Sequence, residues 1–114
     1  MARLTWRFRL ERERIDDDVL VVSMAGRLSA AEAHLLDDAL TAPKDVAVVV
    51  DLEALDYISG PGLAALGAAA GRAAAEKRQF IVCGIQEAVL TCCGLAGLLP
   101  TLVVEPDRAR ALAT

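Results

Sequence analysis

The chain has 114 residues, 55% of them hydrophobic and 25% charged, and a formal net charge of -4 with a pI near 4.9. This length predicts one domain, residues 1–114, around one core, and the composition excludes general disorder, because disordered chains combine low hydrophobicity with high net charge. The acidic balance leaves no electrostatic driving force for nucleic-acid binding, because phosphate backbones are themselves negative.

The first residues predict a β-hairpin. Apolar and polar side chains alternate over residues 4–11, which is the period of a strand with one buried face. A polar turn over 15–18 precedes a second apolar run over 19–26, so we expect the two strands to pair. The arginines of the first strand are mixed with glutamates, which favours a solvated face over a binding patch.

The next segment changes from a period of two to the period of a helix. Ser29 is followed three residues later by Glu32, a capping-box pattern, so we expect the helix to begin near Ser29. An apolar stripe at helical spacing defines the face expected to be buried: Leu28, Ala31, Leu35 and Ala39, beside Leu36 and Leu40. Residues 46–52 are apolar and rich in valine up to Asp51, as expected for a central strand covered on both faces.

The second half of the chain alternates helices and strands. We expect a helix over 62–77, a strand over 79–84, a helix over 86–94 with Gly94 as its C-cap, a strand over 101–104 and a last helix beginning at Pro106. This order predicts an α/β fold: a mixed β-sheet with an N-terminal β-hairpin, then alternating helices and strands, with about four helices packed on the sheet.

The segment YISGPGLAAL, residues 57–66, joins the central strand to the next helix and allows three interpretations. The first is a nucleotide cradle, because Gly60, Gly62 and Ala65 fit the pattern G-x-G-x-x-A at a strand-to-helix junction. A dinucleotide site also needs a carboxylate about 20 residues later to hold the ribose. The sequence there is IVCG, so we expect no nucleotide and no other cofactor.

The second interpretation is a serine nucleophile, and two features argue against it. In a G-x-S-x-G elbow the residues two positions before and after the serine are small, whereas Ser59 has Tyr57 and Pro61 in those places. The only histidine, His34, has Asp38 as its i+4 neighbour on a helix, which favours a solvated surface residue over a general base. We therefore expect a protein that is not an enzyme.

The three cysteines predict neither a disulfide framework nor a metal site. Their number is odd, Cys92 and Cys93 are neighbours, and together with Cys83 and His34 they lack a spacing that converges on one metal ion. We expect them to be small buried residues. The sequence shows no basic-then-apolar leader and no apolar run of about 18 residues, so we expect a cytoplasmic protein without direct membrane insertion.

The third interpretation is a protein-docking surface, and it follows from a resemblance. Residues 48–66, VVVDLEALDYISGPGLAAL, resemble the signature of STAS domains, the family of bacterial anti-sigma-factor antagonists. The matching residues are Asp51, Leu52, Tyr57, Ile58, Ser59, Gly62 and Leu63. Residues 21–36 and 80–100 resemble flanking parts of the same family in the same order, so the resemblance extends from Val19 to the C-terminus.

The resemblance implies a regulatory, protein-binding function. Antagonists of this family bind an anti-sigma factor, often itself a serine kinase. Phosphorylation of a serine at the start of the second helix abolishes binding, because phosphate brings about -1.5 to -2 charges into a packed interface. The expected partner is such an anti-sigma factor or another regulatory protein. The residues expected to face it are Ser29, Tyr57, Ser59, Gly60, Pro61, Gly62 and Leu63.

Counted from Asp51, the phosphoacceptor serine of the family falls on Gly60, which has no hydroxyl. Two interpretations of the neighbouring Ser59 stay open. It is a shifted phosphosite, or it lies just outside a helix whose cap is Gly60 and whose first residue is Pro61, with its hydroxyl bonded to local backbone. Alternative functions within the family are an accessory subunit of a lipid-transport ABC complex and a stressosome-type scaffold.

Overall fold

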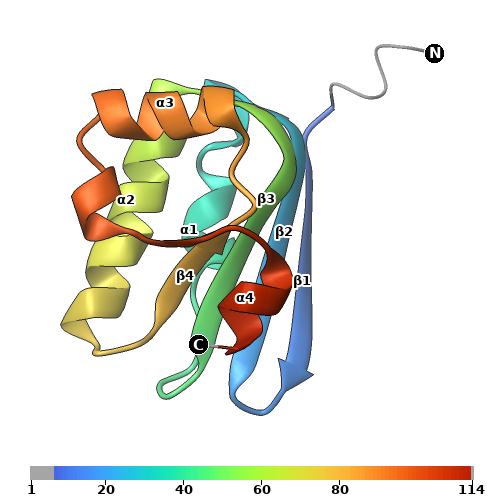
Figure 1. Ribbon diagram of the computed structural model, residues 1–114, viewed down its shortest axis with the longest axis vertical. Helices are drawn as coiled ribbons and strands as arrows, with labels where there is room; N and C mark the ends of the chain where they lie inside the picture. The colour runs from blue at the N-terminus through green and yellow to red at the C-terminus, as the bar shows by residue number, and fades with distance from the viewer. Residues whose placement is uncertain (1–6, 114) are drawn as a thin grey trace.

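The computed structural model describes residues 7–113, which form a five-stranded sheet with helices on both of its faces (Figure 1). The strands are β1 (Arg9–Asp16), β2 (Val19–Leu28), β3 (Ala47–Ile58), β4 (Phe80–Cys83) and β5 (Val103–Glu105). The α-helices are α1 (Leu35–Ala39), α2 (Gly60–Ala75), α3 (Glu87–Leu95) and α4 (Arg108–Ala113), and two short 3₁₀ helices are η2 (Ala30–Glu32) and η3 (Leu99–Thr101).

The sheet is mixed, as expected for a hairpin followed by alternating helices and strands. β1 and β2 pair antiparallel, and β2 through β5 pair parallel in chain order. Residues 4–6 of the predicted first strand lie outside the described residues. The turn is shorter than the expected 15–18, because Asp16 still pairs with Val19 and its carboxylate accepts a hydrogen bond from the Asp18 N–H at 2.7 Å.

Instead of the single core expected from the length, alternate side chains of the strands enter two separate cores, one on each face of the sheet. On one face Val22, Val50 and Val82 are fully buried among side chains of α1, α2 and α3. The smaller core on the other face lies against α4 and contains Val21, Val49, Ile81, Cys83 and Ala111. Figure 1 shows α4 in front of the strands and α1 behind them. The valines of the run 46–52 are therefore buried on both faces, as expected for a central strand.

The helix expected from Ser29 onward is broken into the 3₁₀ turn η2 and the five-residue α1. The stripe predicted through Ala31 and Leu35 is wrong, because Ala31 is exposed and Leu35 is 43% exposed. A 3₁₀ turn has about three residues rather than 3.6. The buried face therefore passes through other positions, namely Ala33, Leu36, Ala39 and Leu40.

The C-terminus of α3 is closed by Gly97, not by Gly94 as expected. Gly97 has a φ of 76°, and its N–H donates to the Gly94 carbonyl at 3.1 Å. The Leu98 N–H donates to the Cys93 carbonyl at 3.0 Å. These two bonds form a Schellman motif, which requires a residue of positive φ just after the C-cap. Gly94 instead lies inside the helix.

The last helix, α4, begins at Arg108, two residues after the expected start at Pro106. Asp107 precedes it, and its carboxylate accepts a hydrogen bond from the Arg110 N–H at 2.8 Å. The start is set by Asp107, because its oxygen satisfies an N–H of the first turn that has no partner within the helix.

Candidate functional site

The candidate site lies where β2 and β3 end side by side. Leu28 pairs with Ile58, and the Ser59 N–H donates to the Leu28 carbonyl at 2.8 Å. β3 therefore continues beyond the expected end at Leu52, because β2 provides it with a hydrogen-bonding partner up to Ile58. Ser29 follows Leu28 directly, so η2 and α2 begin at the same end of the sheet.

Ser59 is the N-cap of α2. Its backbone is extended, with φ -81° and ψ 167°, and its Oγ accepts a hydrogen bond from the Gly62 N–H at 3.1 Å. Gly60 and Pro61 are the first and second helical residues. The interpretation that places the cap at Gly60 is wrong by one position, because the serine oxygen satisfies a free N–H of the first turn and glycine has no such group. Its second part is confirmed, since the Ser59 hydroxyl is bonded to local backbone.

Two of the seven predicted contact residues are buried. Ser59 is 7% exposed, and Gly62, in the first turn of α2, is buried. A Cβ added at Gly62 would lie 3.0 Å from side-chain atoms of both Leu28 and Ile58. These two residues therefore fix the helix start on the core and present little surface to a partner.

The other five predicted residues form the surface of the site, which we call the Gly60 surface: Ser29, Tyr57, Gly60, Pro61 and Leu63. Gly60 and Pro61 are exposed, and Tyr57 is 38% exposed. Ser29 and Leu63 are half-buried. A Cβ added at Gly60 would meet no atom within 4 Å, so this position faces open space.

Arg27 adds a cation beside this surface that sequence reasoning missed. Its guanidinium carbon lies 4.2 Å from the centre of the Tyr57 ring, a cation–π contact. Arg27 and Tyr57 are opposed in the parallel pairing of β2 with β3. Only the register of the two strands could have indicated this contact. That register cannot be predicted from the sequence, because the pairing is irregular between Gly26 and Arg27.

Ser29 is held in place by Glu32. The Glu32 carboxylate accepts a hydrogen bond from the Ser29 backbone N–H at 3.1 Å and another from the Ser29 hydroxyl. These bonds hold the pKa of Glu32 below its ordinary value, and the bond from the hydroxyl is the larger cause. The predicted pairing of Ser29 with Glu32 is confirmed, although it begins a 3₁₀ turn rather than an α-helix.

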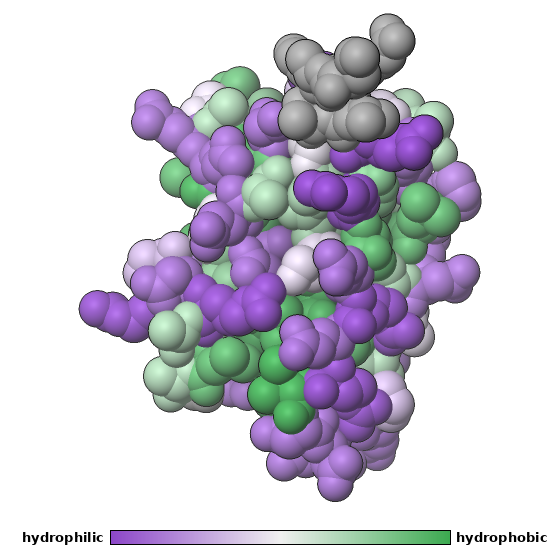
Figure 2. All heavy atoms as spheres, turned by 90° about the vertical axis from the view of Figure 1, so that its right-hand side faces the viewer, coloured by the Kyte–Doolittle hydropathy of each residue, from purple (hydrophilic) through white to green (hydrophobic). Residues whose placement is uncertain are grey.

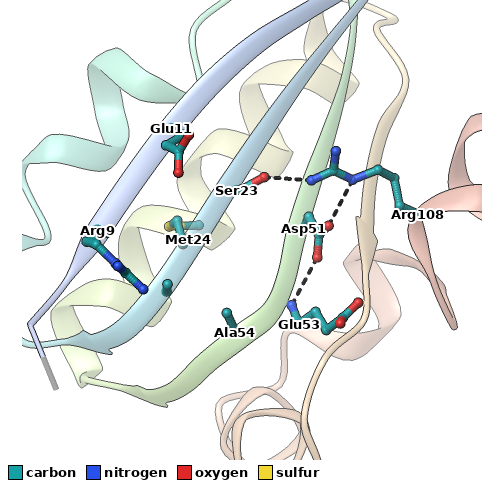
Figure 3. A pocket seen from close by; sticks show the side chains of 9 residues that line it. Arg9, Glu11, Ser23, Met24, Asp51, Glu53, Ala54 and Arg108 are labelled. Atoms are coloured by element: carbon teal, nitrogen blue, oxygen red, sulfur yellow. Dashed lines mark hydrogen bonds and ion pairs between the residues drawn. The ribbon is translucent and has the colours of Figure 1, made fainter. Parts of the chain in front are cut away.

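Asp51, one of the residues that carry the resemblance, fastens α4 to the sheet. Its Oδ2 pairs with Nε of Arg108 at 3.0 Å, and its Oδ1 accepts from the Glu53 N–H at 3.0 Å. Arg108 also donates to the Ser23 hydroxyl at 2.8 Å (Figure 3). Cys83 pairs with Asp51 in the sheet, and burial, together with that nearby carboxylate, raises the pKa of the Cys83 thiol to about 11.

An open hollow of about 530 Å³ lies beside this ion pair, on the α4 face of the sheet. Its charged side chains are of both signs, as Figure 3 shows: Arg9, Glu11, Asp51, Glu53 and Arg108. Asp51 and Arg108 neutralise each other. The hollow therefore offers no concentration of one charge that would select an anionic or a cationic ligand.

The residues considered for catalysis or metal binding do not form a site. His34 is exposed just before α1, and the Ser59 hydroxyl is engaged in the cap of α2. All three thiols are free, with Cys83 and Cys93 buried and Cys92 half-buried. Among residues 7–113, no three His, Cys, Asp or Glu side chains are grouped so that they could hold a metal ion. No helix in this range has both the length and the hydrophobicity needed to cross a membrane.

Comparison with known families matches residues 11–103 to the family described as Mlab, STAS domain. The chain belongs to the STAS domain family. The matched range includes the Gly60 surface and Asp51, whereas Arg108, the ion-pair partner of Asp51, lies just beyond it. A comparison with curated protein sequences found no match.

Solved structures of STAS-like proteins share the fold. An anti-sigma factor antagonist from Mycobacterium paratuberculosis is 28% identical with a TM-score of 0.75, covering 94% of this chain and 92% of that chain. A variant of RsbS from Moorella thermoacetica is 22% identical with a TM-score of 0.75, and 92% of each chain is covered. The phosphorylated form of SpoIIAA from Bacillus is 14% identical with a TM-score of 0.67, covering 92% of this chain and 97% of that chain. The last two show the fold alone.

Proposed function

We propose that this STAS protein is a non-catalytic regulatory module of the anti-sigma-factor antagonist type, which binds an anti-sigma factor of the serine-kinase type or another regulatory protein. The observation that carries the proposal is the exposure of Gly60 at the first helical position of α2, facing open space. It is supported by the likeness to the mycobacterial antagonist. A glycine and a proline let a partner approach the backbone closely, and Tyr57 and Arg27 are residue types enriched at interfaces.

The proposed module lacks the usual switch at the position where its family carries it. Gly60 has no hydroxyl to accept phosphate. Ser59 is poorly placed to replace it, because it is 7% exposed and its Oγ already accepts the Gly62 N–H. We therefore propose that binding is constitutive or is controlled through the partner. Phosphorylation of Ser59 is the competing hypothesis.

The second candidate function is that of an accessory STAS subunit in a lipid-transport ABC complex. This second candidate is supported by the match of residues 11–103 to the family described as Mlab, STAS domain. In this role the protein docks on an ATPase instead of an anti-sigma factor, so the class of the captured partner distinguishes the two functions. A stressosome-type scaffold would instead be indicated by capture of other STAS proteins.

The variant Gly60→Asp tests the contact surface. A carboxylate at this position brings the negative charge that phosphate would bring. It leaves the fold intact, because the added atoms face open space and an acidic residue in the first helical turn is favourable. Gly71→Asp is the matched control, since Gly71 is an exposed glycine of the same helix with equally open space around it.

Affinity capture from native lysate, with mass spectrometry of the bound proteins, gives the readout. We expect the wild type and Gly71→Asp to capture the same anti-sigma factor, and Gly60→Asp to bind it at least about tenfold more weakly, because an unpaired charge is costly in an interface. A Gly60→Asp variant that keeps every partner would show that the contact surface is elsewhere.

Incubation of the protein with the captured kinase tests Ser59 separately. Phosphate found on Ser59 would overturn the proposal that binding is constitutive.

A further inference from the structure

The sheet has an unpaired edge at β1. This strand is the first in the order β1-β2-β3-β4-β5, and within residues 7–113 it pairs only with β2. All of its residues except Leu10 are exposed. Figure 2 views the molecule from the side of β1, where strongly hydrophilic side chains surround hydrophobic ones. An unpaired edge of this length can pair with a further strand.

Side chains of β1 and of the residue just before it form two rows. On the α4 face, Arg9 and Glu11 line the hollow described above. On the α1 face, Phe8, Leu10 and Arg12 line an apolar groove of about 430 Å³ against α1. Arg9 and Glu11 are exposed and form no ion pair within residues 7–113. The edge thus carries an unpaired cation, an unpaired anion and an uncovered groove.

We propose that a second copy of this chain pairs with β1 edge to edge and antiparallel, about a two-fold axis at Leu10. In this register Leu10 lies opposite the partner's Leu10, Arg9 lies opposite the partner's Glu11, and Phe8 lies opposite the partner's Arg12. Directly opposed residues of antiparallel strands share one face and contact each other. The pairs are therefore two leucines, opposite charges, and an arginine against an aromatic side chain, although the Arg12 guanidinium already donates to the Thr41 carbonyl at 2.9 Å in its own chain.

The order of the charges selects this register over its neighbours. An axis at Arg9 would oppose two arginines, and an axis at Glu11 would oppose two glutamates. Like charges directly opposite each other are destabilising in a sheet. The axis at Leu10 avoids both contacts, and it also brings Arg7 opposite the partner's Glu13.

The occupant is a second copy because the edge is complementary to itself. If the charges of β1 served only to prevent association, like charges would lie opposite each other when the strand pairs with a second copy of itself. Here the charges on the two sides of Leu10 are opposite in sign, which makes the strand a match for its own rotated image. The Gly60 surface lies at the start of α2 and not on β1, so dimerisation does not depend on the proposed function.

Charge reversals measured by sedimentation velocity of the full chain test the dimer. We expect wild type to pass from monomer to dimer between low micromolar and millimolar concentration. Arg9→Glu and Glu11→Arg each create two like-charge pairs by symmetry, so each is expected to weaken dimerisation about tenfold. The double variant Arg9→Glu/Glu11→Arg exchanges the charges and is expected to restore dimerisation. Lys44→Glu, an exposed loop residue with the same charge change as Arg9→Glu, is expected to have no effect.

Each outcome of this series bears directly on the proposal. Weakened single variants with a restored double variant support it. A wild type that stays monomeric at millimolar concentration, single reversals without effect, or a double variant that fails to recover would each overturn it. Circular dichroism verifies folding, which the reversals leave unchanged because neither side chain has an ion-pair partner in the described residues.

Oxidative cross-linking locates the axis independently. In a Cys92→Ala background, Leu10→Cys is expected to form a disulfide-linked dimer, because opposed residues of antiparallel strands have Cβ atoms about 4.5–5.5 Å apart. Arg12→Cys is the control, since the two copies of residue 12 would lie about 13 Å apart along the strands. Efficient cross-linking through residue 12 but not through residue 10 would refute the register.

Discussion

Replacing Ser59 by alanine removes the cap of α2 while keeping most of the side-chain bulk. The Ser59 Oγ accepts the Gly62 N–H at 3.1 Å where Ser59 is 7% exposed and Gly62 is buried, so water has little access to replace the lost acceptor. Alanine in place of an N-cap serine costs about 0.5–2 kcal/mol. Because this cap is buried, we expect the free energy of unfolding to fall by about 1–2 kcal/mol, in the upper part of that range.

Urea and thermal unfolding, followed by circular dichroism, measure this loss. For a domain of about 100 residues, each kcal/mol lowers Tm by about 4–8 °C, well above experimental error. The urea m-value should stay unchanged, because the variant exposes the same surface on unfolding. Gly60→Ala is the control: it lies one residue away, and its added Cβ meets no atom within 4 Å. We expect no loss of stability in this control.

Two results would refute this reasoning. One is a Ser59→Ala variant that unfolds at the same urea concentration as wild type. The other is a Gly60→Ala variant that loses as much stability as Ser59→Ala. The first result would show that the Ser59 hydroxyl does not cap α2, and the second would show that Gly60 does not face open space.

Gly71→Ala is expected to raise the free energy of unfolding by about 0.5–1 kcal/mol in urea titrations, because alanine is the better helix former and an added Cβ meets no atom within 4 Å. In the folded protein, iodoacetamide at about pH 8 is expected to leave Cys83 and Cys93 unmodified, since burial raises the pKa of both thiols and only thiolates react. Rapid labelling of either cysteine, measured by peptide mass spectrometry, would contradict this prediction. The pKa of Glu32 is lowered, so its contribution to stability is present above the ordinary value of 4.5 and is lost as pH falls through the folded-state pKa. Ser29→Ala is expected to raise the pKa of Glu32 toward 4.5 in an NMR titration, and an unchanged value would show that the hydroxyl bond is not its main cause.

The order of strands and helices could be predicted because the hydrophobic period reports which face of an element is buried. Of the alternation expected over 4–11, residues 9–11 lie in β1 and Phe8 directly precedes it. The continuous apolar run over 46–52 lies in β3 except for Val46, which directly precedes that strand. The exposure of Gly60 could be anticipated from its distance to Asp51 along the family signature. The structure places it at the first turn of α2, facing open space.

Helix ends could not be predicted to the residue, because several nearby residues compete for each cap. Ser59 and Gly60 are both acceptable caps by type, and the hydrogen bond to Gly62 decides between them. Gly94 and Gly97 compete in the same way at the end of α3, where the chain adopts positive φ only at Gly97. These choices depend on how the finished helix docks on the core.

Contacts between distant residues were the least predictable part of the site. Arg108 and Asp51 are 57 residues apart in the chain, and nothing in either neighbourhood indicates their ion pair. The stacking of Arg27 on Tyr57 likewise depends on strand register. Both contacts form only when the parallel strands have aligned, which local sequence patterns do not describe.

Because the space beyond Gly60 is empty, a larger side chain fits there without repacking its surroundings. Some glycine and serine codons differ by one base, so a single point mutation could install the hydroxyl that a kinase needs. On the proposed function, one evolutionary step then separates a permanently active protein from one that can be silenced, while the scaffold stays the same. On the same reasoning, the engineered variant Gly60→Ser would be a protein whose binding phosphorylation can abolish.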